Sequence, residues 1–226
     1  MMKPIAFFLL ILVFFAYSCN QNGDKNNSQS GNFKYIDSVR IVGEENFLTG
    51  YLPRFNDGEI NAVIEIPSGS VEKWEVNAQT GEMEWIHDLG VPRKVSYMAY
   101  PGNYGFVPQT LLPVEDGFDG DPLDVIILGT AVERGSVIKC KLIGVMKMID
   151  SKQPDDKLIA VRSGTPFYDI NSIIDLNEQF NGITYILQTW FTNYKGDGIV
   201  EITGFGEKDE AVELLVKAIN SFKANQ

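Results

Sequence analysis

Short apolar runs separated by turn residues fill the middle of the sequence, and this pattern restricts the fold more than any other feature. The runs are rich in β-branched residues and end at Pro, Gly or Asp, which is typical of β-strands. The predicted strands are residues 61–66, 71–76, 82–87, 124–128, 136–149 and 157–161. Thr80-Gly81 predicts a hairpin turn, and Gly144 predicts a bend or bulge that lets a small sheet curl into a barrel.

The pattern changes in the last fifty residues. Apolar residues recur there at intervals of three and four, which predicts amphipathic helices over residues 183–194 and 211–222. Residues 198–203 between them predict one more strand. A strand-rich body whose helices come late in the chain is typical of the α+β class. We therefore predict a small closed β-barrel flanked by helices, one of which is a C-terminal amphipathic helix.

The N-terminus has the features of a signal peptide. Lys3 precedes an unbroken apolar run, residues 5–16, which is shorter than the roughly 20 residues that span a bilayer. The end of this run, Ala-Tyr-Ser-Cys19, resembles a bacterial lipobox, in which the chain is cleaved before the cysteine and the thiol is lipidated. Ordinary secretion with cleavage nearby and an uncleaved anchor are the alternatives. We favour an exported cell-envelope lipoprotein that is attached to the membrane through Cys19.

The rest of the chain forms one domain after a tether. The polar, Asn- and Ser-rich stretch that follows Cys19 has no periodicity and is typical of a flexible linker. The predicted organisation is a signal peptide (1–18), a lipid-anchored tether (19–34) and a single domain (35–226). Once Cys19 is lipidated, Cys140 has no partner for a disulfide, and we predict that it is a small buried apolar residue.

Charge narrows the classes of ligand. The net charge is −11, which argues against nucleic acid as a partner, because phosphate backbones are bound by clustered Lys and Arg. An excess of carboxylates suits divalent cations, although a merely acidic surface explains the net charge equally well. His87 is the only histidine, which excludes a His-rich zinc site.

The acids at residues 119–124 are placed for metal binding. Three aspartates fall within six residues, on a Gly- and Pro-containing turn that leads into a strand. Carboxylates this close repel one another unless a cation lies among them, and oxygen ligands favour a hard divalent ion. Thr130 stands where an EF-hand loop needs an acid, which excludes that motif. Asp150 and Asp155 flank a predicted hairpin loop that either faces this group or is ordinary turn chemistry.

These segments resemble the soluble family I inorganic pyrophosphatases. Residues 119–124 read DGDPLD, which is similar to the D-G-D-P-x-D motif of that family. Further matches occur in the family's order and together cover about residues 60–205: residues 63–67, 73–75, 100–105, 150–157 and 191–195. The resemblance implies hydrolysis of pyrophosphate to two phosphates, in an α+β fold built on a small closed OB-like β-barrel.

The resemblance also implies roles for individual residues. Asp121 would be the general base on the attacking water. The metal ligands would be Asp119, Asp124, Asp150, Asp155, Glu65 and Glu75. The residues that bind the substrate would be Lys73, Arg93, Tyr100, Tyr104, Lys157, Tyr194 and Lys195. Lys94 is an alternative to Arg93, and Ser151 stands where the family often has a second acid after Asp150.

The implied cofactors are several Mg²⁺ ions per site, with Mn²⁺ as the alternative. Cations are needed because pyrophosphate and a hydroxide nucleophile repel each other. The implied partners are pyrophosphate, the membrane through the lipid anchor, and further copies of the chain in a homo-oligomer. One alternative is a lipid-anchored divalent-cation-binding scaffold without catalysis, which predicts acids without converging lysines and tyrosines. The others are a hydrolase of nucleotides or polyphosphate and a degenerate pyrophosphatase.

Overall fold

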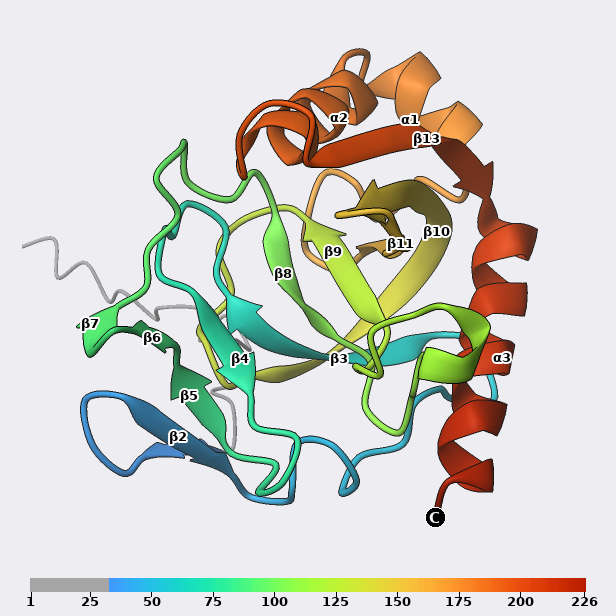
Figure 1. The fold of residues 1–226 in the computed structure, drawn as a ribbon. Helices are drawn as coiled ribbons and strands as arrows, with labels where there is room; N and C mark the ends of the chain where they lie inside the picture. The colour runs from blue at the N-terminus through green and yellow to red at the C-terminus, as the bar shows by residue number, and fades with distance from the viewer. Residues whose placement is uncertain (1–32) are drawn as a thin grey trace, which may run out of the picture.

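The computed structural model describes residues 33–226. The predicted signal peptide, Cys19 and nearly all of the predicted tether lie outside the described residues. In the described part, strands come first and three α-helices follow, which confirms the α+β class (Figure 1). No helix within residues 33–226 is both long enough and apolar enough to cross a membrane.

The larger sheet has seven strands and occupies the centre of the molecule (Figure 1). β9 and β12 run parallel, whereas the other pairs run antiparallel, so the sheet is mixed. Its strands are β3 (Ile60–Ile66), β8 (Asn103–Phe106), β9 (Asp124–Leu128), β10 (Val137–Asp150), β11 (Gln153–Pro154), β12 (Lys157–Val161) and β13 (Val200–Glu207).

The helices cover two sides of this sheet (Figure 1). α1 (Ile173–Gln179) and α2 (Ile183–Asn193) lie beside β13, and α3 (Lys208–Ala224) ends the described chain on another side. A single 3-10 turn, η1 (Val114–Asp116), precedes the acidic loop. The two predicted amphipathic helices are therefore confirmed as α2 and α3.

Two hydrophobic cores explain the uninterrupted apolar runs of the central strands. In β9, Val125 and Ile127 pack in the core that α3 covers, whereas Ile126 and Leu128 pack in the core under α1 and α2. β12 alternates in the same way. A strand that is buried on both faces carries no polar alternation. Cys140 is fully buried in the first core, as predicted.

β10 changes partner along its fourteen residues. Its first residues pair with β3, its middle with β12 and its last residues with β13. The register shifts at Gly144, which confirms the predicted bulge. A Cβ on Gly144 would lie 2.4 Å from the side chain of Ile173 and 2.6 Å from the carbonyl oxygen of Gly206, so a larger residue does not fit without movement. Because β10 pairs with both β12 and β3, the path β3–β8–β9–β12–β10 returns to its first strand.

A smaller, four-stranded sheet lies beside the large one (Figure 1). It consists of β1 (Phe33–Tyr35), β2 (Arg40–Gly43), β4 (Trp74–Val76) and β5 (Met83–Trp85). β4 and β5 form the predicted hairpin, although both strands are shorter than predicted. A separate two-stranded hairpin follows, β6 (His87–Asp88) with β7 (Val91–Pro92). The small sheet packs on the large one through a third core that includes Trp74, Met83 and Phe106.

β8 and α1 are among the elements that were not predicted. β8 begins in the Tyr-Pro-Gly-Asn-Tyr segment and continues to Phe106, and its Gly105 approaches β3 so closely that a Cβ would lie 1.8 Å from the carbonyl oxygen of Val63. α1 starts at Ser172, whose Oγ accepts a hydrogen bond from the backbone N–H of Asp175 (2.9 Å). It buries only Ile173 and Leu176, which is too few residues to produce a helical period in the sequence.

Candidate active site

A cavity of about 270 Å³ brings together segments from both sheets and from the end of α2. Its polar lining contains every predicted site residue of the domain except Tyr100, which lies behind it: Glu65, Lys73, Glu75, Arg93, Tyr104, Asp119, Asp121, Asp124, Asp150, Asp155, Lys157, Tyr194 and Lys195. Seven of these residues are carboxylates and four are cations. Such a set would spread apart on a surface, so the fold itself imposes their proximity.

Backbone turns fix the first acidic group at the cavity. Gly120 has a φ of +89°, which favours glycine, and the backbone N–H of Asp121 donates to Asp119 Oδ1 (3.0 Å). Thr110 Oγ accepts from the backbone N–H of Leu123 (2.9 Å) and donates to the carbonyl of Val107 (2.5 Å). The loop is therefore tied to β8 on one side and runs into β9 on the other.

Parallel pairing of β9 and β12 explains why Asp124 meets Lys157. These residues are the first of their strands, and the register pairs Val125 with Leu158 directly after them. The Lys157 ammonium donates to both Asp124 Oδ2 and Asp155 Oδ1. It is only 2% exposed, so it is a buried cation that is compensated by two carboxylates.

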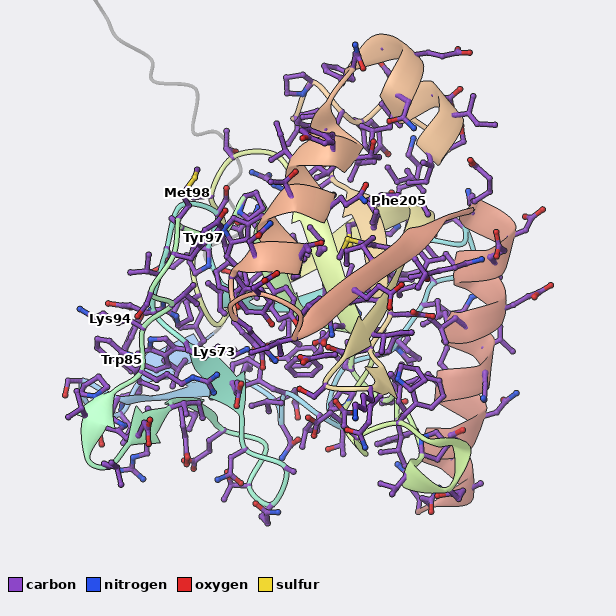
Figure 2. All side chains as sticks on the ribbon, turned by 45° about the horizontal axis from the view of Figure 1, so that its top comes forward. Lys73, Trp85, Lys94, Tyr97, Met98 and Phe205 are labelled. Atoms are coloured by element: carbon purple, nitrogen blue, oxygen red, sulfur yellow. The ribbon has the colours of Figure 1, made fainter. Side chains whose placement is uncertain are left out.

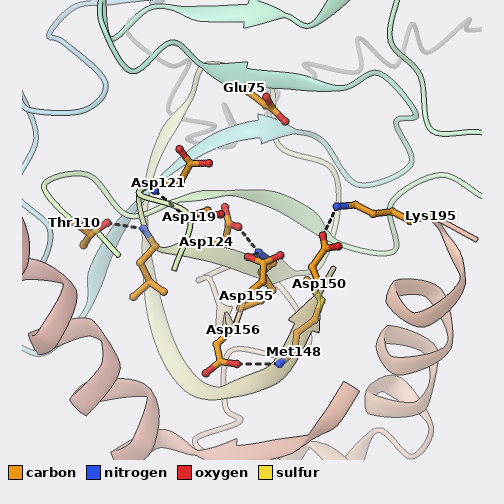
Figure 3. A network of polar contacts seen from close by, with 12 residues as sticks. Glu75, Thr110, Asp119, Asp121, Asp124, Met148, Asp150, Asp155, Asp156 and Lys195 are labelled. Carbon is orange, nitrogen blue, oxygen red and sulfur yellow. Dashed lines mark hydrogen bonds and ion pairs between the residues drawn. The ribbon is translucent and has the colours of Figure 1, made fainter. Parts of the chain in front are cut away.

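The second acidic group flanks the β10–β11 turn, as predicted. Asp150 ends β10 and its carboxylate forms an ion pair with the Lys195 ammonium (Figure 3). The backbone N–H of Asp155 donates to the carbonyl of Met148 (2.8 Å). The side chain of Asp156 points away from the cavity and accepts from the backbone N–H of Met148 (2.9 Å) (Figure 3). Only one of the two adjacent aspartates therefore belongs to the site.

Aromatic rings form the wall next to α2. Tyr194 follows the last residue of α2 and stacks on Trp190, with 4.7 Å between ring centroids. Trp190 also contacts Tyr100 (4.5 Å), which in turn contacts Tyr104 (5.4 Å). Tyr104 lines the cavity, and the Lys73 ammonium lies 5.4 Å from its ring centroid. Tyr100 is 3% exposed and supports this wall from behind.

Arg93 and Lys94 point in different directions. Arg93 lines the cavity, and its carbonyl accepts a hydrogen bond from the backbone N–H of Lys73 (3.0 Å). Lys94 does not line the cavity, and its ammonium lies 5.7 Å from the ring centroid of Trp85 (Figure 2). The geometry therefore favours Arg93 over Lys94 for contact with a ligand in the cavity.

Burial raises the pKa values of several carboxylates of the cavity. Burial raises the pKa of Glu65 to about 8. The pKa of Asp121 rises to about 6, mainly through burial and then through the nearby Asp119 and Asp124. Burial also raises the pKa of Asp155, against the effect of Lys157. Burial disfavours the charge of Lys157 as well, but its two carboxylate partners hold its pKa above the ordinary value.

Without metal, the free energy of unfolding is expected to fall as the pH rises from about 5 to about 8. Glu65 and Asp121 have raised pKa values in the folded state, so the folded chain binds more protons than the unfolded chain across this window. Stability then decreases with pH until these groups are ionised in both states. Urea unfolding in EDTA at several pH values measures this, and Mg²⁺ should restore stability at pH 8. A flat or rising profile in EDTA would contradict it.

The donor set fits a hard divalent cation. All the acidic groups of the cavity supply carboxylate oxygens, which suit Mg²⁺ and Mn²⁺, and a bound cation would offset the cost of burying their charge, which raises the pKa values of Glu65 and Asp121. Across residues 33–226, no three acidic, imidazole or thiol groups converge closely enough to form a metal site as they stand. Lys157 instead bridges Asp124 and Asp155. The assignment of particular ligands therefore stays a prediction.

Some contributors to the cavity were not predicted. Apolar residues complete its lining: Val76, Ala78, Val95, Phe106 and Pro122. Trp190 was predicted only as a core residue of the helix, and its role in stacking Tyr100 and Tyr194 follows from tertiary contacts. Phe106 follows from strand alternation with Tyr104, and Pro122 belongs to the predicted acidic turn, but alternation places Val76 on the face opposite Glu75, so its place in the lining follows only from the fold.

Comparisons with known proteins agree with this cavity. The family described as inorganic pyrophosphatase matches residues 62–223, which includes every acidic residue of the cavity. An inorganic pyrophosphatase from Corynebacterium efficiens is 36% identical over 169 residues, which are 73% of this chain and 99% of that protein. One from Gluconobacter oxydans is 36% identical over 73% of this chain and 92% of its own length. The crystal structure of the Thermus thermophilus inorganic pyrophosphatase superposes with a TM-score of 0.66 at 29% identity, covering 79% of this chain and 99% of that one.

Proposed function

The chain belongs to the inorganic pyrophosphatase family, and from this membership we propose that it hydrolyses pyrophosphate to two phosphates with the help of divalent metal ions. The observation that carries the proposal is the convergence of seven carboxylates and four cations in one cavity. Carboxylates alone would suit a cation store, and cations alone would suit an anion receptor. Both kinds of group together suit a metal-bound polyanion.

We propose that Mg²⁺, or Mn²⁺ in its place, is held by Asp119, Asp124, Asp150, Asp155, Glu65 and Glu75. These side chains supply the hard oxygen donors that such ions prefer. When bound, the ions would neutralise phosphate oxygens and lower the pKa of the attacking water. The carboxylates would in turn hold the cations beside buried walls, where electrostatic interactions are strong. Lys157 would release Asp124 and Asp155 in part, because the metal ions would then supply the positive charge that these carboxylates need.

Asp121 is the proposed general base. Its carboxylate projects into the cavity from the tip of the acidic loop (Figure 3), and no lysine of residues 33–226 forms an ion pair with it. Its pKa of about 6 is close to neutrality, which suits a group that takes a proton from water and later gives it up. The oxygen of that water attacks one phosphorus atom, the bridging P–O bond breaks, and the leaving phosphate keeps the bridging oxygen.

The cations and tyrosines would bind the phosphates. Lys73, Arg93 and Lys195 project into the cavity from different elements and would neutralise charge on both the transferred and the leaving phosphate. The hydroxyl groups of Tyr104 and Tyr194 would donate to phosphate oxygens, because burial holds both pKa values above the ordinary value and keeps the hydroxyls protonated. Tyr100 would close the site from behind the aromatic wall, and Lys157 would close it from its place between Asp124 and Asp155.

Phosphate release from pyrophosphate is expected only when a divalent metal is present. The purified chain should release phosphate in Mg²⁺ or Mn²⁺, and the release should stop in excess EDTA, because the cavity carboxylates repel pyrophosphate that has no bound metal. The control is ATP at the same concentration, which should be hydrolysed far more slowly. A folded chain that releases no phosphate in either metal would exclude the proposed activity and favour the cation-binding scaffold. Nothing in the structure otherwise favours the scaffold, since the lysines and tyrosines converge on the acids.

The location and the assembly are also proposals. We propose export and lipid attachment through Cys19, on the basis of the apolar run and the lipobox-like residues. The mass of the mature N-terminus tests this, because an unmodified or uncleaved Cys19 excludes it. We propose a homo-oligomer because the family resemblance implies one and because Met98 and Tyr185 are exposed apolar side chains. The returning strand path of the large sheet supports the proposal of a closed, OB-like barrel.

A further inference from the structure

Arg134 is a buried cation that the proposed chemistry does not use. It is 8% exposed and stands just before β10. Its Nε donates to the carbonyl of Glu65 (2.9 Å), and its Nη2 forms an ion pair with Glu72 Oε2 (2.9 Å) and a longer contact with Ser70 Oγ (3.4 Å). The guanidinium carbon lies 4.5 Å from the ring centroid of Trp74. It does not line the cavity.

These contacts lie on the reverse side of a cavity wall. Neighbouring residues of an extended chain point to opposite sides. Lys73 and Glu75 line the cavity and pair with each other at 3.1 Å, whereas Glu72 and Trp74 point to the other side. There the indole Nε1 of Trp74 donates to Glu72 Oε2 (3.3 Å), the same carboxylate oxygen that Arg134 contacts. Arg134 therefore contacts the segment that presents Lys73 and Glu75 from the side that faces away from the cavity.

The contacts of Arg134 join the two sheets. In the described part of the chain, no strand of the four-stranded sheet is paired with a strand of the seven-stranded sheet. The aspartates of the cavity belong to the large sheet and its loops, whereas Glu75 belongs to the small one and Lys73 immediately precedes its strand β4. Two polar contacts cross between β3 and this wall: Glu65 Oε1 accepts from the backbone N–H of Val76 (2.7 Å), and Arg134 links the Glu65 carbonyl to Glu72 and Trp74.

We propose that Arg134 is a positioning residue, which sets the distance between the Lys73–Glu75 wall and the aspartates on the opposite side of the cavity. A guanidinium is suited to this role because it donates in several fixed directions and stacks on an aromatic ring at the same time. An ammonium could satisfy Glu72, but not Glu72, the Glu65 carbonyl and Trp74 together. This inference rests on the proposed function for its effect on catalysis, but not for its effect on the wall.

The test compares Arg134→Met and Arg134→Lys with Lys139→Met in the full-length protein. Lys139 is a matched control because it also forms two ion pairs, with Asp57 and Glu59, but on an exposed face of β10 away from the cavity. Arg134→Met is expected to raise KM for pyrophosphate about tenfold with kcat changed less than threefold, because the displaced wall carries Lys73, a proposed substrate-binding residue, and misplacing such a group is costly. Arg134→Lys should fall between this variant and wild type. Adding Glu72→Gln to Arg134→Met shows how much of the effect comes from an unpaired Glu72.

Amide hydrogen exchange measures the wall itself. Residues 72–77 should exchange faster in Arg134→Met, while residues 137–146 of β10 and the whole Lys139→Met control stay as in wild type. Faster exchange together with the raised KM supports the proposal. A KM equal to that of wild type overturns the proposal, and so does unchanged exchange of residues 72–77. A variant that merely contains less folded protein would show a lower apparent kcat with the wild-type KM, so misfolding cannot imitate the expected result. If wild type itself does not hydrolyse pyrophosphate, the proposed function fails, and the exchange of residues 72–77 alone decides the role of Arg134.

Discussion

Asp121→Asn is expected to lower kcat for pyrophosphate hydrolysis by about 10²–10⁴-fold, the range found when a general base is removed. Asparagine has nearly the same shape, and it preserves the loop because the backbone N–H of residue 121, not its side chain, bonds to Asp119. It cannot accept the proton of the attacking water. In the metal-free cavity, burial and the neighbouring acids raise the pKa of Asp121 to about 6, and bound Mg²⁺ would lower it. Wild-type kcat should therefore decrease as the pH is lowered to about 6 or further, and the residual rate of the variant should not follow the same curve.

Two controls separate a base from a metal ligand. Asp156→Asn changes an aspartate next to Asp155 that points away from the cavity, and an asparagine there can still accept from Met148, so activity should stay within about threefold. The Mg²⁺ concentration for half-maximal activity should be similar in wild type and Asp121→Asn. An Asp121→Asn variant whose activity returns to normal at high Mg²⁺ would identify Asp121 as a metal ligand and exclude it as the base.

Lys157→Met is expected to destabilise the metal-free protein by about 3–5 kcal/mol, the usual consequence of removing one partner from a buried ion pair. The ammonium is almost fully buried and bonds to both Asp124 and Asp155, so its loss leaves two adjacent carboxylates without positive charge. Methionine keeps most of the length and volume of the side chain, which limits the packing loss. Urea unfolding in EDTA measures the deficit. In Mg²⁺ the deficit should shrink, because a divalent ion supplies the missing charge.

Lys147→Met is the matched control. Lys147 lies on β10 and pairs with Glu210, but both side chains are more than two-fifths exposed. An exposed ion pair contributes about 0–1 kcal/mol, so this variant should be nearly as stable as wild type. If Lys157→Met were equally harmless in EDTA, Asp124 and Asp155 would have to be protonated or hydrated in the metal-free protein. The idea that Lys157 compensates them would then be wrong.

The sequence could predict those features that depend on local patterns. The runs at 124–128 and 157–161 became β9 and β12, and the helical period after residue 182 became α2 and α3. The acidic turn at residues 119–124 was predicted because glycine, proline and three aspartates in six positions act within one loop. Resemblance to a family extended this to residues that lie far apart in the chain, and the cavity contains all of the predicted set from the domain but Tyr100.

The features that were missed depend on long-range contacts. Asp155 was correctly chosen over Asp156 only through the family resemblance, because nothing local distinguishes the residue that faces the cavity from the one that bonds to Met148 on the other side. β8 is a strand because Gly105 fits against Val63, forty-two positions away. Arg134 follows an acid in an ordinary polar loop, and only the folded chain brings it to Trp74 and Glu65. In each case the role of the residue depends on a partner that is distant in the sequence, so the residue and its local surroundings do not predict it.

The cavity collects side chains from Glu65 on β3 to Lys195 beyond α2. A ribosome has therefore synthesised most of the domain before the last of the proposed phosphate-binding side chains exists. Many of the contacts join distant parts of the chain, and such contacts form late in folding. If the chain is threaded across a membrane before it folds, the site cannot assemble until residue 195 has crossed. An exported precursor would then not hydrolyse pyrophosphate in the compartment where it is synthesised, because its active site would assemble only after the chain has crossed the membrane.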